Sequence, residues 1–318
     1  MAEKIIIDTD PGIDDAMAIF YALESPELEV LGLTTIFGNG FTDVTTANAL
    51  KLLEIAERTD IPVSRGADHP FKGKFTDPAT FVHGDDGQGN INLPAPLGKP
   101  VDERASEFII QKVNEFPGEV TLVPIGPLTN IALALLAEPG LDKKIKRIVL
   151  MGGNCFCAGN ATPAAEANIV KDPEAADIVF RAACPITVCG LDVTEKVLMK
   201  AAVLDSIGEI DNPRAQHLAK ILPFYRSFYK TVLGDTDIHV HDSTAITYLL
   251  RPELFTVIKR PVVVATCNGV GRGKTFPGRH EFDHMGLWKD RQAVEICINA
   301  DVPAVIDFEM KRLADSKV

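Results

Sequence analysis

Four aspartates lie within eight residues near the start of the chain, in the segment Ile-Ile-Ile-Asp-Thr-Asp-Pro-Gly-Ile-Asp-Asp-Ala. The apolar run before them predicts a buried strand over residues 4–8, and Pro11-Gly12 predicts a turn into a helix over residues 14–24. Open α/β sheets bind their ligands at the carboxyl ends of such strands. Helix capping explains one or two acids, but four on one turn repel one another, and a bound Ca²⁺ or Mg²⁺ would relieve that repulsion. The segment therefore predicts a metal site among Asp8, Asp10, Asp14 and Asp15, with Asp8 and Asp10 expected on the same side of the strand.

Strands and helices that alternate along the chain must position this cluster. Apolar periodicity predicts further strands over 28–36, 120–125, 147–151 and 186–189, and further helices over 42–58, 104–114, 127–136 and 173–181. The second half is less regular, with helices expected over 213–233, 242–250 and 302–313 and strands over 262–266 and 292–299. This alternation predicts an α/β fold with a single open, mostly parallel sheet flanked by helices. No linker-like stretch interrupts it, so we expect one domain over residues 1–318.

Two long segments, residues 66–99 and 152–168, are rich in Gly, Pro, Asn and Asp and are predicted to be loops. Long loops within an α/β chain usually hold the ligand.

The composition restricts the kind of ligand. The 318 residues include 44 acidic and 32 basic side chains, and this balance argues against a nucleic-acid partner, which needs clustered Lys and Arg. The sequence shows no signal-peptide core, no apolar run long enough to cross a bilayer and no Cys-x-x-Cys pair among its six cysteines. We therefore expect free thiols, a cytoplasmic location, a small-molecule ligand and no membrane partner.

Two other kinds of protein carry similar acidic segments. An EF-hand does not fit, because its ligand positions and closing Glu are missing. A phosphatase of the haloacid dehalogenase type also begins with Asp-x-Asp after a first strand, and its first Asp is a nucleophile. The pair Asp14-Asp15 is not part of that pattern, which counts against such an enzyme. An Mg²⁺-dependent phosphatase is therefore kept only as the alternative enzyme.

Seven motifs resemble those of one enzyme family. Asp8 to Ala16 resembles the N-terminal signature of the nucleoside hydrolases of the inosine–uridine preferring type, which cleave the N-glycosidic bond of ribonucleosides. The other motifs follow in the family's order and span most of the chain, at 34–39, 82–87, 121–132, 151–153, 165–176 and 240–245. The resemblance implies a nucleoside hydrolase-like fold with a Rossmann-type core, and the hydrolysis of purine or pyrimidine ribonucleosides to free base and ribose.

The same resemblance implies a Ca²⁺ site and a group that activates water. Asp10, Asp15 and Asp242 would bind Ca²⁺ together with the main-chain carbonyl of Ile125. Asp10 would also be the general base, and Asp242 would contact the substrate as well. A hard cation lowers the pKa of water and a nearby carboxylate accepts the proton, which differs from glycosidases that use two opposed carboxylates.

Polar side chains are implied for the ribose. Asp14 and Asn168 would bind the 2′- and 3′-hydroxyls with Asn39 nearby, and Glu166 and Asn160 would bind the 5′-hydroxyl. Taken without the resemblance, the three asparagines are typical of turns.

Histidines and tyrosines are implied for the base. His241 would protonate the leaving base, because histidine titrates near neutral pH, and His83 would contact the nucleoside. Tyr225 and Tyr229 would stack on the base or take part in its protonation. His239 is interpreted as an ordinary loop histidine whose hydrogen bonds are satisfied.

A protein of a different class is a second alternative, namely a catalytically silent metal- and ribose-binding protein. The complete set of acids favours the enzyme. Homologous enzymes are typically dimers or tetramers, so we expect a homodimer or homotetramer that serves nucleoside salvage. The sequence does not rank inosine, uridine, cytidine or a modified nucleoside, and it does not separate Ca²⁺ from Mg²⁺, because both accept carboxylate oxygens.

Overall fold

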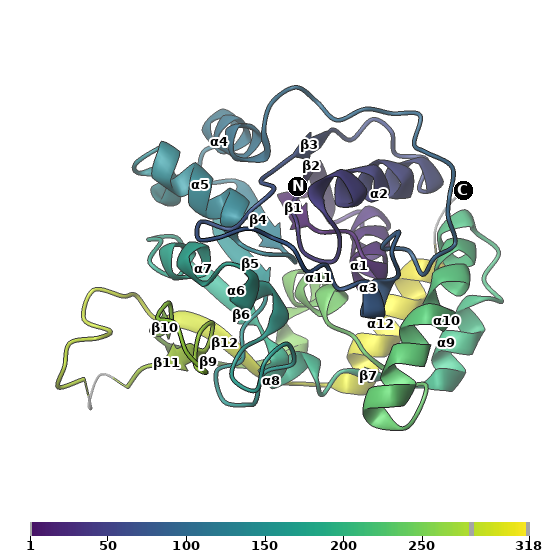
Figure 1. The fold of residues 1–318 in the computed structure, drawn as a ribbon. Helices are drawn as coiled ribbons and strands as arrows, with labels where there is room; N and C mark the ends of the chain where they lie inside the picture. Colours follow the sequence, from purple (N-terminus) through teal and green to yellow (C-terminus); the bar gives the residue numbers. More distant parts are fainter. Residues whose placement is uncertain (1, 280–282, 316–318) are drawn as a thin grey trace.

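The computed structural model describes residues 2–279 and 283–315, and an eight-stranded sheet forms its centre (Figure 1). In chain order the strands are β1 (Glu3–Thr9), β2 (Leu28–Thr35), β3 (Val63–Arg65), β4 (Val120–Pro124), β5 (Arg147–Met151), β6 (Ile186–Cys189), β9 (Phe255–Arg260) and β12 (Val294–Ala300). Their order across the sheet is β3-β2-β1-β4-β5-β6-β12-β9. Neighbouring strands are parallel except at the edge, where β9 runs antiparallel to β12. The predicted open, mostly parallel α/β sheet is confirmed.

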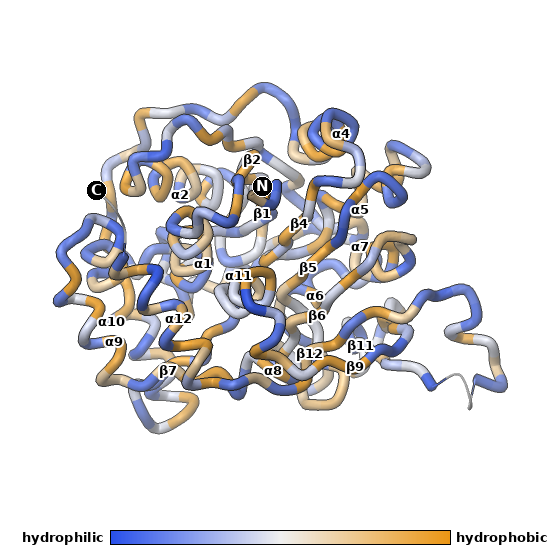
Figure 2. Tube along the Cα trace, turned by 180° about the vertical axis from the view of Figure 1, so that it is seen from behind, coloured by the Kyte–Doolittle hydropathy of each residue, from blue (hydrophilic) through white to orange (hydrophobic). Residues whose placement is uncertain are grey.

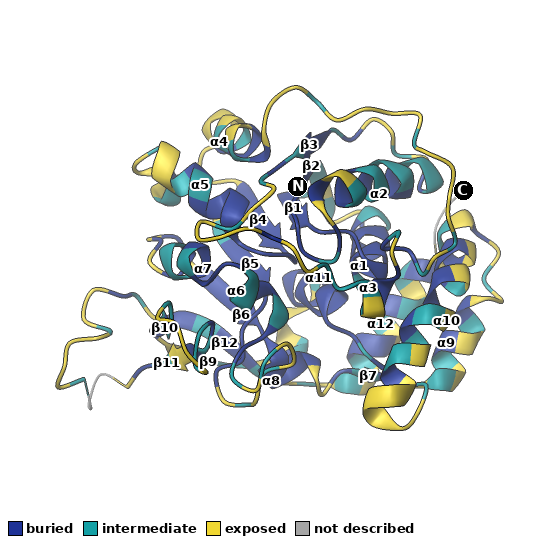
Figure 3. Cartoon of the chain, viewed as in Figure 1, coloured by how far each residue is buried: buried dark blue, intermediate teal, exposed yellow. Residues whose placement is uncertain are grey.

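Helices cover both faces of the sheet (Figures 1 and 3). On one side of the sheet lie α1 (Ile13–Leu23), α2 (Thr42–Ile55) and α11 (Asp242–Leu250), with α10 (Pro213–Leu233) and α12 (Val302–Ala314) packed against α1. On the other side lie α4 (Ala105–Glu115), α5 (Thr129–Ala137) and α7 (Pro173–Val179). Shorter helices are α3 (Thr80–His83), α6 (Ala167–Lys171), α8 (Leu191–Thr194) and α9 (Ala201–Ile207), with 3₁₀ turns at Leu141–Lys143 and Pro252–Leu254. Within the described ranges, none of these helices has both the length and the apolar character that crossing a bilayer requires.

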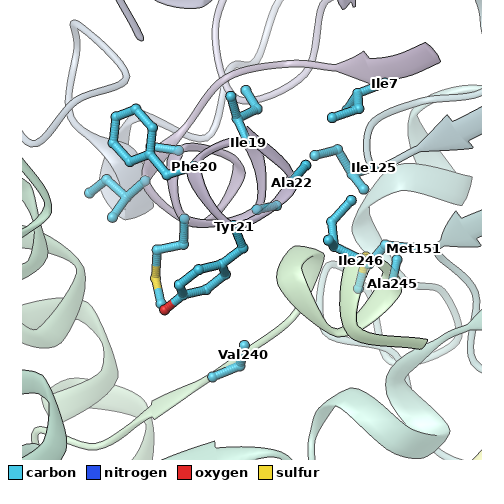
Figure 4. Close-up of a cluster of buried hydrophobic side chains, with 14 of the residues drawn as sticks. Ile7, Ile19, Phe20, Tyr21, Ala22, Ile125, Met151, Val240, Ala245 and Ile246 are labelled. Carbon is cyan, nitrogen blue, oxygen red and sulfur yellow. The ribbon is translucent and has the colours of Figure 1, made fainter. Parts of the chain in front are cut away.

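The central strand β1 shows why an apolar run forms this sheet. Ile5 and Ile7 belong to the core on the α1 side, and Ile6 belongs to the core on the α5 side. Successive side chains of a strand point to opposite faces, so a strand covered on both faces needs an unbroken apolar run. Burying each of these isoleucines contributes about 1.5–3 kcal/mol. Hydrophobic segments accordingly follow the strands (Figure 2), and Figure 4 shows Ile7 and Ile19 among the buried side chains of the α1 side.

The order of the strands reverses at β1, which pairs with β2 on one side and β4 on the other. In open α/β sheets, ligands bind outside the carboxyl ends of the strands at this reversal. The loop after β1 begins with Asp10, and the loop after β4 begins with Ile125. The topology therefore places two of the predicted metal ligands at the expected binding crevice.

The second half of the chain departs from the predicted strands. The strand expected over 262–266 covers only Val262–Val264 (β10), and it pairs with β11 (Thr275–Pro277) in a separate two-stranded sheet. The sheet edge is instead β9, which periodicity does not predict because its buried and exposed residues do not alternate and half of them are polar. A second small pair, β7 (Leu198–Met199) with β8 (Ile238–His239), is too short to show a period in sequence. The helix expected over 42–58 ends at Ile55, and Glu57 adopts a positive φ of 56°.

A buried acid, Glu309, lies on α12 against α11. Thr247 donates a hydrogen bond from its Oγ1 to Oε1 of Glu309 at 2.8 Å. Burial raises the pKa of Glu309 from its usual 4.5 to about 7. Because the folded pKa lies above the unfolded one, this group stabilises the fold most below pH 4.5, and that contribution is lost as the pH rises through 7.

We expect Glu309→Gln to stabilise the protein at pH 8 by up to about 3 kcal/mol and to leave its stability nearly unchanged near pH 4. Glutamine keeps the acceptor for Thr247 and does not ionise. Urea denaturation at the two pH values measures the difference. Glu295→Gln is the control: burial raises the pKa of Glu295, but hydrogen bonds from Tyr248 and Lys259 outweigh burial and lower it, so this variant should lose stability at pH 8. An equal effect of Glu309→Gln at both pH values would contradict the prediction.

Candidate active site

A cavity of about 950 Å³ opens where the loops after β2, β4 and β5 meet α1, α3, α6, α10 and α11. Its lining includes most of the predicted site residues, namely Asp14, Asn39, His83, Ile125, Asn160, Glu166, Asn168, Tyr225, Tyr229, His241 and Asp242. The two remaining ones, Asp10 and Asp15, are fully buried beside it. The fold therefore brings all the site residues that the family resemblance implies to one place.

Three carboxylates converge at the floor of the cavity. Asp14 and Asp15 lie in the first turn of α1 and Asp242 is the first residue of α11, and one carboxylate oxygen from each lies within 4.8 Å of the others. Burial, and then the charge of Asp15, raises the pKa of Asp14 to about 7. Burial, and then the charge of Asp14, raises the pKa of Asp242 well above its usual range. The two helix N-termini favour negative charge here, but acids this close together still call for a cation.

Asp15 is held by four hydrogen bonds. Its Oδ1 accepts from the Thr9 hydroxyl at 2.5 Å and from the Asp10 N–H at 3.2 Å. Its Oδ2 accepts from the Gly12 N–H and from the Asn39 side chain, each at 2.9 Å. These bonds fix the orientation of the carboxylate before any ligand enters.

Asp10 lies beside the three converging carboxylates and has one unused oxygen. Its Oδ2 accepts from the Asn39 N–H at 2.7 Å, and its Oδ1 has no hydrogen-bond partner among the described residues. Burial, and then the charge of Asp15, raises the pKa of Asp10 well above its usual range. Gly38 and Gly126 flank the side chain, and a Cβ at either position would overlap an oxygen of Asp10. Glycine at both positions therefore leaves the space that this buried carboxylate occupies.

Asp8 is not part of the cluster. Its Oδ1 accepts hydrogen bonds from the Thr34 hydroxyl at 2.5 Å and from the Asn130 side chain of α5 at 2.8 Å. Asp8 lies within β1 on the same side as Ile6, so it joins β1 and β2 to α5. The prediction that Asp8 and Asp10 share the metal site is wrong for Asp8, because the regular strand ends at Thr9 and alternation does not extend to Asp10.

Glu166 and Asn160 organise the loop that enters α6. Glu166 is the N-cap of α6, and its carboxylate accepts from the N–H groups of Asn168 and Ile169 at 2.8 and 3.1 Å. The N–H of Gly153, at the end of β5, donates to the same carboxylate at 2.9 Å. The Asn160 side chain accepts from the backbone of α6 at 3.0 Å. Both side chains therefore stabilise this loop as well as line the cavity.

Asn168 joins the ends of two strands. Its Nδ2 donates to the carbonyl of Ile125 at 3.0 Å and to the carbonyl of Met151 at 3.2 Å. A carbonyl oxygen has two lone pairs, so that of Ile125 can accept this bond and bind a cation as well.

A line of hydrogen-bonded side chains leads from the carboxylates to His241. Tyr225 donates from its hydroxyl to Asp14 at 3.2 Å, and the hydroxyls of Tyr225 and Tyr229 are 3.5 Å apart. The Tyr229 hydroxyl lies 3.0 Å from Nε2 of His241, and Nδ1 of His241 lies 2.8 Å from the Thr194 hydroxyl. Burial, and then the proximity of His239, lowers the pKa of His241 to about 3, so its imidazole is neutral at pH 7.

His83 has a defined tautomer. The N–H of Ile13 donates to its Nδ1 at 3.1 Å, so the proton of the neutral ring lies on Nε2. Burial lowers the pKa of His83 to about 3, which keeps the ring neutral. Its ring is stacked on that of Tyr225, with centroids 5.7 Å apart.

Two residues of the cavity wall were not predicted. His239 lines the cavity, and its Nδ1 has no partner within the described part of the chain, so the interpretation of it as a satisfied loop histidine is wrong. It precedes His241 by two residues, a spacing that indicates a shared side of an extended segment. Lys171 also lines the cavity, three residues after Asn168 on α6. The signal in the sequence is helical spacing, because residues three apart lie on the same face of a helix.

The doubly wound sheet with a carboxylate cluster at its reversal point defines an α/β protein whose site suits a hard cation and a polar ligand. The family model for the inosine-uridine preferring nucleoside hydrolases matches residues 5–307. The chain therefore belongs to this family and is an enzyme that hydrolyses N-glycosidic bonds. The resemblance found in the sequence motifs is confirmed.

Individual relatives resemble the chain over nearly its whole length. The probable uridine nucleosidase 2 of Arabidopsis thaliana is 45% identical, over 99% of this chain and 98% of the relative. The structure of a plant nucleoside hydrolase, PpNRh1, has a TM-score of 0.96 at 41% identity and covers 99% of this chain and 100% of its own. The purine-preferring ribonucleoside hydrolase from Gardnerella vaginalis has a TM-score of 0.91 at 33% identity over 98% of each chain.

Proposed function

We propose that the protein is a Ca²⁺-dependent ribonucleoside hydrolase that releases free base and ribose from purine and pyrimidine ribonucleosides. The observation that carries the proposal is the convergence of Asp14, Asp15 and Asp242 at the cavity. Asp14 and the neighbouring Asp10 each have an oxygen without a partner among the described residues. Buried carboxylates are normally paired or bound to a metal ion. The family to which the chain belongs is metal-dependent.

The donor set supports Ca²⁺ in particular. Asp10, Asp15, Asp242 and the carbonyl of Ile125 would hold the ion. Ca²⁺ takes roughly six to eight oxygen ligands in a flexible arrangement, whereas Mg²⁺ demands a stricter octahedron and usually keeps several waters. Three carboxylates, a carbonyl and two hydroxyls of a ribose offer more protein and substrate oxygens than Mg²⁺ usually accepts. When bound, the ion would lower the pKa of a water molecule.

The proposed base is Asp10, which accepts the proton of the attacking water. Its Oδ2 is fixed by the Asn39 N–H, and the unpartnered Oδ1 is available for the proton. In the metal-free protein burial raises the pKa of Asp10, which favours its uptake of a proton.

The proposed ribose contacts come from side chains that are already fixed. Asp14, Asn168 and Asn39 bind the 2′- and 3′-hydroxyls, and Glu166 and Asn160 bind the 5′-hydroxyl. A substrate without one of these hydroxyls would leave a buried polar group unpaired. The site should therefore discriminate against 2′-deoxynucleosides.

The proposed acid for the leaving base is His241, with His83, Tyr225 and Tyr229 around the base. Because the ring of His241 is neutral at pH 7, its Nε2–H would donate a hydrogen bond to the departing base, in place of the Tyr229 hydroxyl, as negative charge develops there. The hydroxyl of Tyr229 at its Nε2 orients the ring and connects it to Tyr225.

We expect His241→Ala to lower kcat/KM for inosine and uridine by about 10²-fold, the usual contribution of a general acid. The same variant should retain most of its activity on p-nitrophenyl riboside, because p-nitrophenolate leaves without protonation. Comparing the two substrates in one assay measures the role of His241 in leaving-group departure. Equal losses on both substrates would show that the side chain acts on the ribose or on the fold instead.

The names of the relatives support a broad base range, since one is a uridine nucleosidase and another prefers purines. We propose that residues 1–318 form a single domain that works in the cytoplasm as a homodimer or homotetramer, in nucleoside salvage.

The test of the proposed function is the release of ribose and base from inosine, adenosine, guanosine, uridine and cytidine. We expect equimolar ribose and free base from one or more of them. Phosphate release from phosphomonoesters without ribose release would favour the phosphatase. Binding of nucleosides with no release, by folded and Ca²⁺-loaded protein, would favour the silent binding protein.

A further inference from the structure

A lysine reaches into the carboxylate cluster. Lys171 is the last residue of α6, its side chain is 13% exposed, and its Nζ lies 3.8 Å from Oδ2 of Asp10. Lysine side chains are mostly exposed, and those that are largely buried are normally paired with an acid. Its position on the helix, one turn after Asn168, directs it into the same cavity.

Lys171 is the buried positive charge of the site. Among the described residues, the cavity is lined by two lysines and no arginine, and the other lysine, Lys74, is exposed. The histidines of the site that are fully buried, His83 and His241, are neutral at pH 7 because burial lowers the pKa of each to about 3. One ammonium group therefore faces a cluster of several buried carboxylates and compensates only part of their charge.

The contact between Lys171 and Asp10 is electrostatic. A separation of 3.8 Å is longer than a hydrogen bond, and Oδ2 of Asp10 already accepts the Asn39 N–H. Burial raises the pKa of Asp10, Asp15 and Glu166, and the charge of Lys171 opposes that effect in each case. A flexible ammonium held by charge alone can move aside when a divalent ion enters.

We infer that Lys171 is a resident counter-cation, which stabilises the metal-free enzyme and weakens its binding of the divalent ion. The inference rests on the proposed metal site. Without a metal ion, Lys171 reduces the repulsion among the buried carboxylates. When the ion binds, the same positive charge repels it. Lys171 therefore lowers the affinity for the ion and raises the stability of the metal-free protein.

The test compares three variants of the whole protein after removal of metal with a chelator. Lys171→Met removes the charge, Lys171→Arg keeps it, and Lys74→Met makes the same change in net charge on the exposed part of the cavity wall. Calorimetric titration with Ca²⁺ alone gives the dissociation constant without any need for turnover. Thermal melts with and without Ca²⁺ give the stability of each form.

For Lys171→Met we expect about a tenfold lower dissociation constant for Ca²⁺. Its metal-free form should melt at a lower temperature than the parent, and Ca²⁺ should raise its Tm by more. Lys74→Met and Lys171→Arg should stay close to the parent in both measurements. If Lys171→Met does not fold without metal, Lys171→Gln is the variant to titrate, and the same decrease is expected.

Unchanged or weaker Ca²⁺ binding by Lys171→Met would overturn the inference, as would an equal gain in Lys74→Met. In both cases the parent still binds Ca²⁺, so the proposed function survives. A parent protein that binds no Ca²⁺ would instead contradict the proposed metal site itself.

Discussion

Asp10→Asn should lower kcat for ribonucleoside hydrolysis by about 10³- to 10⁴-fold, because an amide does not accept the proton of water. Asparagine has the size of aspartate and fits between Gly38 and Gly126, where no larger side chain has room. The substitution also removes one of the buried charges that repel Asp15. We therefore expect the metal-free variant to melt at or above the temperature of the parent, which separates lost chemistry from lost folding. Steady-state rates at saturating Ca²⁺ and a thermal melt are the two measurements.

Asp8→Asn is the matched control for Asp10→Asn. Asp8 is a buried acid two residues earlier in the chain, but its Oδ1 bonds to Thr34 and to Asn130 of α5, on the side of the sheet to which Ile6 points. Its substitution should change turnover by no more than a few-fold. Turnover by Asp10→Asn within tenfold of the parent, or equal losses in the two variants, would contradict the assignment of Asp10 as the base.

The parts of this protein that could be predicted from its sequence are those fixed by local periodicity. The isoleucines of β1 and the turn at Pro11-Gly12 indicate a strand, a loop and a helix, and the repetition of that pattern indicates the parallel sheet. The failure at Asp8 has the same origin. Alternation holds within a regular strand, and β1 ends at Thr9, so the orientation of Asp10 depends on the loop and not on the strand period.

The site residues far from β1 could be predicted only through the family resemblance. Asn168 donates to the carbonyls of Ile125 and Met151, which lie 43 and 17 residues away in the chain. No spacing within the sequence shows that these groups meet. Local spacing connects Lys171 to Asn168 and His239 to His241, but it places them in the cavity only once Asn168 and His241 are known to lie there.

Removal of the metal is the second experiment with a large expected effect. Chelation should lower ribose release to less than about 1% of the initial rate, and Ca²⁺ should restore it, because the proposed water activation needs the ion. The fold should also lose stability. A ligand present at about 100 times its dissociation constant stabilises a protein by about 2.7 kcal/mol, so we expect the Tm to fall by about 5 °C on chelation.

The decrease in Tm on chelation should be larger at pH 8 than at pH 6. In the metal-free protein, burial and the charge of Asp15 raise the pKa of Asp14 to about 7, above its usual 3.8. Protonation of Asp14 therefore relieves the repulsion at pH 6, and that stabilisation is lost as the pH rises through 7. Bound Ca²⁺ neutralises the cluster at both pH values. Scanning fluorimetry with chelator or with Ca²⁺ at each pH gives the four melting temperatures.

Asp242→Asn decides whether these effects come from the carboxylate cluster. Asp242 supplies one of the three oxygens that lie within 4.8 Å of one another, and its removal leaves an incomplete site. The variant should show no change in Tm on chelation at either pH. If it loses stability on chelation as the parent does, the ion binds elsewhere. The proposal that the ion acts in hydrolysis at this carboxylate cluster would then be wrong.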